Sequence, residues 1–372
     1  MTALPKQSLA AVLTSPRKIC LQTFTVPDIG DDEILVKVEG CGICGTDVHE
    51  YKNDPFGLAP VILGHEGTGK IVKLGANVNR DSAGHPVSCG DLIVTSVLVC
   101  GECPPCKQLP GRGNLCEHLG LYGLLPDDTH YHLNGWFAEY IVLRPKSTFF
   151  IVNDMSLDQR LLIEPAAVAV HALERAKLTG LLTFNSKVIV QGCGPIGLLQ
   201  IAVLRTMGIE NIIALDTHPR RLAAASTLGA THQINVSDFT DITALSEHIL
   251  SVTEGAGADF GFQCTGAPQA AANLWKWIKR GGGLCEVGFF VNNGECSINP
   301  HTDICNKEII AVGSWAYSLQ DYPVTLDFIR RAKATGLPLE QLITHRYPLS
   351  ELNNAMEINI RQEGIKIVIV VD

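Results

Sequence analysis

Residues 187–197 read Lys-Val-Ile-Val-Gln-Gly-Cys-Gly-Pro-Ile-Gly. The β-branched run before the first glycine predicts a strand, and the apolar stretch after Pro195 predicts a helix. Glycines at this junction permit a tight turn, close approach of the backbone to a pyrophosphate, and packing of the helix on the strand. The free N–H groups of a helix N-terminus attract the same anion. The stretch therefore predicts a dinucleotide-binding loop made of Gly192, Gly194, Pro195, Ile196 and Gly197.

An acidic residue follows the next predicted strand. Asp216 lies at the end of Asn211–Leu215, about 20 residues beyond the glycines, where a carboxylate can accept hydrogen bonds from the adenosine ribose hydroxyls. The same charge repels a 2′-phosphate, which favours NAD over NADP. Arg220 and Arg221 lie near enough to leave NADP open, although a solvated first turn of a helix also accounts for them. Arg221 is kept as a candidate cofactor residue.

The pattern from Glu164 onward alternates between helix and strand. Alternation at this spacing predicts a doubly wound parallel sheet, that is, an α/β fold covered on both faces. Cys264, Thr265 and Val287 end two later strands, on the side where a nicotinamide is expected. Predicted helices span 166–178, 197–207 and 220–228, and predicted strands span 187–191, 211–215, 260–263, 283–287 and 309–312.

The N-terminal part has a different character. Residues 10–94 contain short β-branched runs broken by Gly, Pro and Asp, which predict a β-rich domain. The C-terminal strand 365–371 is expected to rejoin that domain, because the β-rich part otherwise lacks partners. The predicted boundaries are 1–165 for the β-rich domain, 166–313 for the nucleotide domain and 314–372 for the returning segment.

Composition narrows the class of protein. The chain has 372 residues, 46% of them hydrophobic and 18% charged, as expected for two folded domains. A net charge of −9 without a cluster of Lys or Arg argues against nucleic-acid binding. The most apolar stretch, 188–204, is interrupted by glutamines, a proline and glycines, which argues against a membrane span. No confident signal peptide is present, so a cytoplasmic location is expected.

Four of the thirteen cysteines form a tight group within the lobe 98–117: Cys100, Cys103, Cys106 and Cys116. The segment is rich in Pro and Gly, which predicts an irregular loop that needs a cross-link, such as a bound metal, to hold its shape. The spacing suits four thiolates around a structural zinc. An iron–sulfur cluster is less well matched, because the usual fourth spacing followed by Pro is absent. A thioredoxin-like pair would need a strand before it and a helix after it, against which Pro104 and Pro105 argue.

Two further stretches combine metal-ligand and proton-transfer side chains: Cys44-Gly45-Thr46-Asp47-Val48-His49 and Gly64-His65-Glu66. A lone His or Cys is more often a core residue than a ligand. Together with the dinucleotide loop, the cysteine lobe and Glu164, however, they make the sequence resemble the zinc-dependent medium-chain dehydrogenases, the alcohol and polyol dehydrogenase superfamily. The resemblance also includes Gly75, Val78 and 135–140, and Glu164-Pro165 with Val170-His171-Ala172 resembles the sorbitol dehydrogenase branch.

The resemblance implies a GroES-like β-rich catalytic domain split around a Rossmann domain, with the active site in the cleft between them. It implies two zinc ions per chain, one structural and one catalytic, and NAD as cofactor. The implied catalytic ligands are Cys44, His65 and Glu164, the last directly or through water. Glu66 is implied as either a ligand or a nearby carboxylate that displaces water during turnover.

The resemblance also implies roles for the neighbouring residues. Asp47 would orient the imidazole of His65. Thr46 would take the substrate proton and pass it through the nicotinamide ribose to His49 at the surface. A helix cap and a solvated histidine are the alternatives for these two residues. Lys366 is either a pyrophosphate ligand or an ordinary surface lysine.

The predicted function is reversible oxidation of a polyol or other secondary alcohol to a ketone by a homodimer or homotetramer. A primary alcohol or aldehyde dehydrogenase of the same superfamily is the alternative within this class. A nucleotide-binding protein without activity is the alternative outside it, and the intact Cys44, His65 and Glu164 argue against that. Residues 81–86 and 117–134 differ from the sorbitol-branch pattern, which leaves sorbitol itself open as the substrate.

Overall fold

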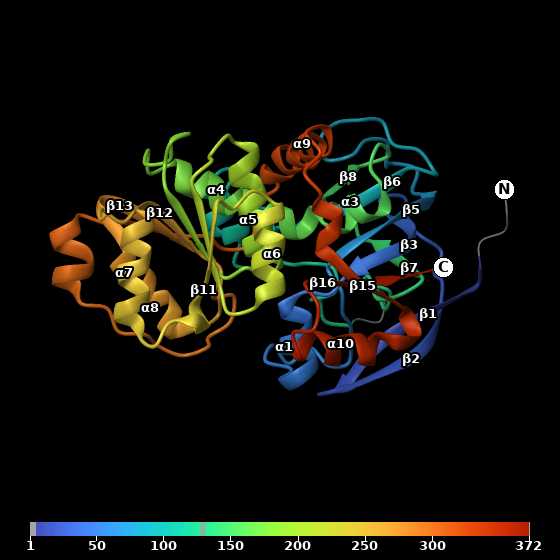
Figure 1. The fold of residues 1–372 in the computed structure, drawn as a ribbon. Coiled ribbons are helices and arrows are strands. Elements are labelled where there is room, and N and C mark those ends of the chain that lie inside the picture. Colours follow the sequence, from blue (N-terminus) through green and yellow to red (C-terminus); the bar gives the residue numbers. More distant parts are fainter. Residues whose placement is uncertain (1–4, 128–130, 372) are drawn as a thin grey trace. The chain divides into compact units, whose positions relative to one another are not determined.

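The computed structural model describes residues 5–127 and 131–371, which form two compact units (Figure 1). Unit 1 consists of Met1–Glu164, Ser318–Pro323 and Ile343–Asp372, and unit 2 consists of Pro165–Tyr317 and Val324–Leu342. The return to the first unit predicted at residue 314 is therefore placed too early. Residues 324–342 stay with unit 2, because the short helix η5 (Leu339–Leu342) packs on α5 (Pro195–Thr206).

Unit 1 is β-rich. Its described residues form a seven-stranded sheet in the order β15-β16-β3-β5-β6-β8, with β7 beside β3, and a three-stranded sheet in the order β2-β1-β4. The strands are β1 (Gln7–Ser15), β2 (Lys18–Thr25), β3 (Ile34–Gly42), β4 (Val61–Ile62), β5 (Glu66–Leu74), β6 (Leu92–Thr95), β7 (Tyr140–Leu143), β8 (Phe149–Ile151), β15 (Ile343–Pro348) and β16 (Lys366–Val370). The helices are α1 (Gly45–Asn53), α2 (Pro104–Gln108), α3 (Leu157–Leu161) and α10 (Leu352–Ile360), with η1 (Gly113–Leu115) and η6 (Leu349–Glu351).

Strand register in unit 1 brings distant segments together. β16 runs antiparallel to β3 and pairs Val368 with Gly42. On its other side β3 pairs Gly42 with Glu66, the first residue of β5. The end of β3 thus lies between the start of β16 and the start of β5, and α1 begins only a few residues later.

Unit 2 is built on a six-stranded sheet in the order β11-β10-β9-β12-β13-β14, and all its strand pairs are parallel. This confirms the predicted fold class. The central strands are buried and rich in Val, Ile and Phe, as expected when helices cover both faces of a sheet. The strands are β9 (Val188–Gln191), β10 (Ile212–Asp216), β11 (His232–Asn235), β12 (Ala258–Gln263), β13 (Ile278–Glu286) and β14 (Ile310–Gly313).

The helices of unit 2 begin with α4, which starts at the end of unit 1 and continues into unit 2. Within residues 5–127 and 131–371, no helix has the length and apolar character needed to cross a membrane. The helices are α4 (Ile163–Lys177), α5, α6 (Pro219–Thr227), η2 (Val236–Asp238), α7 (Ile242–Val252), α8 (Pro268–Trp277), η3 (Pro300–Ile304), η4 (Cys305–Lys307), α9 (Asp321–Ala334) and η5.

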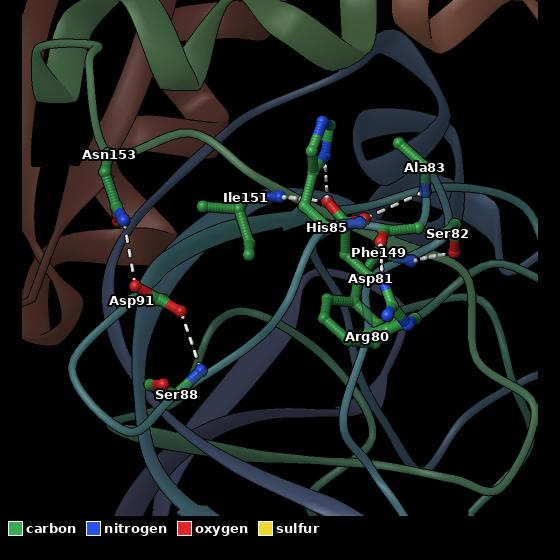
Figure 2. Close-up of polar contacts among 11 residues, drawn as sticks. Arg80, Asp81, Ser82, Ala83, His85, Ser88, Asp91, Phe149, Ile151 and Asn153 are labelled. Carbon is green, nitrogen blue, oxygen red and sulfur yellow. Dashed lines mark hydrogen bonds and ion pairs between the residues drawn. The ribbon is translucent and has the colours of Figure 1, made fainter.

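The loop 81–86 is held by one buried carboxylate, that of Asp81 (Figure 2). One oxygen accepts hydrogen bonds from the N–H groups of Ala83 at 3.0 Å and His85 at 2.8 Å. The other accepts from the N–H of Ile151 in β8 at 3.1 Å and lies 3.3 Å from Nδ1 of His85. The loop that departs from the sorbitol-branch pattern is therefore a turn anchored to a sheet strand of unit 1.

Candidate active site and metal centres

Three side chains with metal-ligand chemistry come together where β3 and β5 lie side by side. The ligand atoms of Cys44, His65 and Glu66 all lie within 4.8 Å of one another. Cys44 directly precedes α1, and His65 directly precedes β5, so both are positioned by the ends of regular elements. His65 and Glu66 are buried. A thiolate, an imidazole and a carboxylate form a donor set that zinc accepts.

Asp47 ties the two ligand segments together. One of its carboxylate oxygens accepts a hydrogen bond from the N–H of Cys44 at 2.8 Å. The other accepts from the N–H of Gly64 at 3.1 Å and lies 3.5 Å from Nδ1 of His65. Asp47 is the third residue of α1, where an acid can reach back to the N-terminus of its own helix. The carboxylate thus lies beside the imidazole of His65, and the orienting role that the resemblance implies for Asp47 stays a prediction.

The surroundings of His65 favour positive charge. Burial by itself would lower the pKa of His65, but the Asp47 carboxylate and the Cys44 thiolate outweigh it, and the pKa lies well above its ordinary value. The same negative surroundings would attract a metal cation. The site therefore fits zinc by its donor set and by its charge.

Two further charged groups lie near the cluster. The ammonium of Lys366 forms an ion pair with Glu66 and donates to the carbonyl of Ile43 at 3.0 Å. Burial lowers the pKa of Lys366, but Glu66, Cys44 and Glu164 together raise it above its ordinary value. Glu164 is thus an electrostatic neighbour of Lys366, whereas Glu66 is the carboxylate within the ligand cluster. Binding of the pyrophosphate by Lys366 stays a prediction.

The predicted proton path begins beside Cys44. The hydroxyl of Thr46 lies 3.7 Å from the Cys44 sulfur, which places it next to the ligand cluster. His49 is partly exposed on the same helix, and burial together with the Lys52 cation lowers its pKa. A neutral imidazole can accept a proton, so both residues have the chemistry of the proposed relay. The relay itself stays a prediction.

The cysteine lobe brings its four sulfurs within 4.8 Å of one another. The sulfur of Cys116 lies 3.5 Å from that of Cys100 and accepts an N–H from His118 at 3.4 Å. Backbone N–H groups, those of Glu102 and Cys103, lower the pKa of Cys100 to about 6, whereas burial raises the pKa of Cys106 to about 12. N–H groups directed at sulfur favour thiolates, and four protein ligands leave no position open. The group therefore fits a structural zinc.

The glycine loop of unit 2 has the geometry that its sequence predicts. Gly192 has a positive φ of 92°. A Cβ on Gly197 would lie 1.7 Å from the carbonyl oxygen of Gly192, so a side chain there would block the approach of α5 to the loop. Gly194 is the N-cap of α5, and Pro195 and Ile196 form its first turn. The first N–H groups of α5 therefore lie at the glycine loop, where a helix N-terminus can bind an anion.

Asp216 does more than close β10. One oxygen accepts the N–H of Cys193 in the glycine loop at 2.7 Å, and the other accepts the N–H of His218 at 2.8 Å. Arg221 lies in the first turn of α6, close enough to Cys193 to influence its pKa. Cys264 and Val287 directly follow β12 and β13, at the same carboxyl edge of the sheet as the loop. Thr265 lies so close to Gly192 that a Cβ there would be 2.6 Å from its methyl group.

Gly42 is a site residue that sequence reasoning missed. It separates Glu66 from Lys366, and a Cβ at this position would collide with both. The available signal was a glycine at the end of a strand pattern, Glu39-Gly40-Cys41-Gly42, which marks a place where another group approaches closely.

Comparison with known proteins identifies the two units. Residues 30–153 match the alcohol dehydrogenase GroES-like domain, and residues 195–331 match the zinc-binding dehydrogenase domain. The sorbitol dehydrogenase of Bacillus subtilis is 34% identical, with 98% of each chain covered. The D-arabitol-phosphate dehydrogenase of Enterococcus avium is 31% identical, covering 93% of this chain and 92% of that protein.

A solved structure agrees with these sequence matches. An alcohol dehydrogenase from Thermotoga maritima superposes with a TM-score of 0.90 at 30% identity. The match covers 98% of this chain and all of the other. The similarity therefore extends over nearly the whole chain, both units included.

Proposed function

Because this chain belongs to the zinc-dependent medium-chain dehydrogenase family, we propose that it oxidises a polyol or another secondary alcohol to a ketone, reversibly, with NAD. Family membership makes it an oxidoreductase that acts on CH–OH groups. The observation that carries the proposal is the cluster of half-buried Cys44 with buried His65 and Glu66, whose two segments Asp47 joins by hydrogen bonds. The named relatives that act on sorbitol and arabitol phosphate support a polyol as the substrate class.

The candidate site residues of unit 1 have different roles in the proposed reaction. A zinc ion held by Cys44, His65 and a carboxylate would act as a Lewis acid and lower the pKa of the substrate hydroxyl. Thr46 takes the hydroxyl proton and passes it to His49 through the nicotinamide ribose that the cofactor would supply, and His49 releases it to solvent. Asp47 keeps the imidazole of His65 oriented throughout. Glu164 supplies a further negative charge close to Lys366. It would be a ligand of the zinc ion, either directly or through a water molecule.

Unit 2 supplies the cofactor site in this proposal. The glycine loop and the N-terminus of α5 would hold the pyrophosphate of NAD, and the nicotinamide would supply a hydride acceptor. Cys264, Thr265 and Val287 line the edge of the sheet where the nicotinamide half would lie. Asp216 binds the adenosine ribose and disfavours a 2′-phosphate.

Asp216→Asn tests the preference for NAD. The amide retains the size of the side chain but loses the charge that repels a 2′-phosphate. Like-charge juxtaposition costs more than about 1.4 kcal/mol, which is a factor of ten, so kcat/KM with NADP should rise relative to NAD by about tenfold or more. The amide also weakens the hydrogen bond from Cys193, so the KM for NAD should increase. Steady-state kinetics with both cofactors measures the ratio, and an unchanged ratio would contradict the assigned role. Asp241→Asn, an N-cap of α7, is a matched control in the same unit.

The proposed reaction is tested with purified, zinc-loaded protein and a panel of alcohols. Secondary alcohols and polyols should reduce NAD with higher kcat/KM than primary alcohols, and the metal content should be about two zinc ions per chain. Higher activity with primary alcohols would instead support the aldehyde-forming alternative. One zinc ion per chain together with no turnover on any alcohol would refute the proposed activity.

Two further features of the protein follow from the proposal. All thirteen cysteines are free, and two clusters need thiolates, which suits the reducing cytoplasm.

The edge strand β14 exposes Ile310, and Trp315 beyond it is 49% exposed. An exposed apolar sheet edge supports a homodimer or a homotetramer built from such pairs.

A further inference from the structure

The ion pair between Glu66 and Lys366 is sealed inside unit 1. The side-chain exposure is 1% for Glu66 and 2% for Lys366. Removing two charges from water is costly, and such a pair often contributes no more stability than apolar residues of the same size would. Its presence beside a ligand cluster therefore calls for an explanation other than stability.

Three neighbouring strands give the pair its geometry. Lys366 begins β16, Gly42 ends β3 and Glu66 begins β5. A Cβ on Gly42 would lie 2.0 Å from Oε2 of Glu66 and 2.8 Å from Cε of Lys366. The missing side chain therefore creates the space in which the lysine on one side of β3 reaches the carboxylate on the other side.

The carboxylate of Glu66 lies where it can interact with two positive charges, the Lys366 ammonium and a bound metal ion. It belongs to the group whose ligand atoms lie within 4.8 Å of one another, and its Oε2 also contacts the Lys366 ammonium. An ammonium held at a carboxylate reduces the electron density that the carboxylate can donate to a metal. The ammonium and the metal therefore compete for the same group.

We propose that Lys366 is a positioning residue that keeps Glu66 a displaceable ligand of the catalytic metal. This role rests on the proposed function of the Cys44, His65 and Glu66 cluster as a catalytic zinc site. A catalytic zinc needs one position open to substrate. Without the ammonium, the carboxylate would remain on the metal and close that position. With it, Glu66 is held within reach and gives way when the substrate oxygen arrives.

Lys366→Met in the full-length chain tests the proposal with Co²⁺ as the probe. We expect Co²⁺ to bind the catalytic site about 10–100-fold more tightly than in the unchanged protein, the range typical of residues behind metal ligands. The visible absorption bands of the cobalt should shift, because Glu66 becomes a permanent ligand. Lys366→Arg keeps the charge and should retain the original affinity and spectrum. Affinity is measured by chelator competition, and Cys44→Ala provides the spectrum of the cysteine lobe alone for subtraction.

A double-mutant cycle shows whether the lysine acts through Glu66. In a Glu66→Gln background, Lys366→Met should change Co²⁺ affinity by less than about twofold, because no carboxylate remains to be released. The same tightening in that background would mean direct repulsion between ammonium and metal, and would overturn the proposal. Weaker or unchanged Co²⁺ binding in Lys366→Met alone would also overturn it, since a purely structural lysine predicts that result. If Lys366→Met does not fold, Lys366→Gln replaces it, because its amide can still donate to the Ile43 carbonyl.

These measurements need neither alcohol nor NAD. A protein that fails to reduce NAD with every alcohol tested contradicts the proposed function, whatever its cobalt affinity. A protein that turns over normally but shows no change in cobalt binding on loss of the Lys366 charge contradicts the positioning role alone. The two proposals therefore fail in different experiments.

Discussion

Cys44→Ala is expected to lose one of two bound zinc ions per chain and to lower kcat/KM by at least about a thousandfold, because a Lewis-acid metal supplies several kcal/mol of transition-state stabilisation and each 1.36 kcal/mol is a factor of ten. Cys44 lies within 4.8 Å of the other two ligand atoms and contributes the only thiolate of that cluster. His65 and Glu66 alone would bind zinc weakly. Metal analysis and steady-state kinetics measure the two effects.

The matched control is Cys89→Ala, which removes an exposed thiol outside both clusters. It should retain both zinc ions and full activity. Cys44→Ala should also keep its fold, because Asp47 binds the backbone N–H of residue 44 and that of Gly64 rather than the sulfur. Near-normal turnover in Cys44→Ala would show that the catalytic centre lies elsewhere.

Cys116→Ala is expected to release the other zinc ion and to open the lobe 98–117. Cys116 is central to the lobe, since its sulfur lies 3.5 Å from that of Cys100 and 3.9 Å from that of Cys103. Most residues of the lobe are exposed or half-buried, so we expect the metal to supply most of its folding free energy. A loss of about 3–5 kcal/mol in unit 1 corresponds to a fall in Tm of about 10 °C. Differential scanning calorimetry and limited proteolysis within 98–117 report the change.

Binding of NAD by unit 2 should be unaffected in Cys116→Ala, because the glycine loop and Asp216 belong to the other unit. Cys296→Ala, which removes an exposed thiol of unit 2, is the control and should leave Tm unchanged. Retention of two zinc ions and of the original Tm in Cys116→Ala would show that the four cysteines do not form a metal site.

Local patterns could be predicted from the sequence because their constraints lie within a few residues. The glycine loop needs small residues at fixed offsets between a strand and a helix, and the structure places it there with a positive φ at Gly192. The cysteine lobe is equally local, because its four ligands span one short segment. The resemblance to zinc-dependent dehydrogenases, which rests on these motifs, is confirmed by the family matches.

Other features depended on long-range register and could not be predicted. The pairing of Lys366 with Glu66 requires β16 to lie next to β3, and nothing near either residue encodes that arrangement. The choice between Glu66 and Glu164 as the clustered carboxylate depends on distances of a few ångströms in the folded chain. The segment 324–342 belongs to unit 2 because of packing on α5, which helical periodicity alone does not reveal.

The hydrogen bonds of Asp47 have a consequence for how the protein matures. They hold the backbone of the segments that carry Cys44 and His65, so these segments can fold before a metal ion binds. In the cysteine lobe, by contrast, backbone N–H groups donate to the sulfurs themselves, so its shape is coupled to the thiolates and to the ion that they would hold. We therefore expect the lobe to acquire zinc as the chain folds, and the Cys44, His65 and Glu66 cluster to exchange its metal in the folded protein. Cellular zinc supply would then limit the yield of folded protein through the lobe and its activity through the catalytic centre.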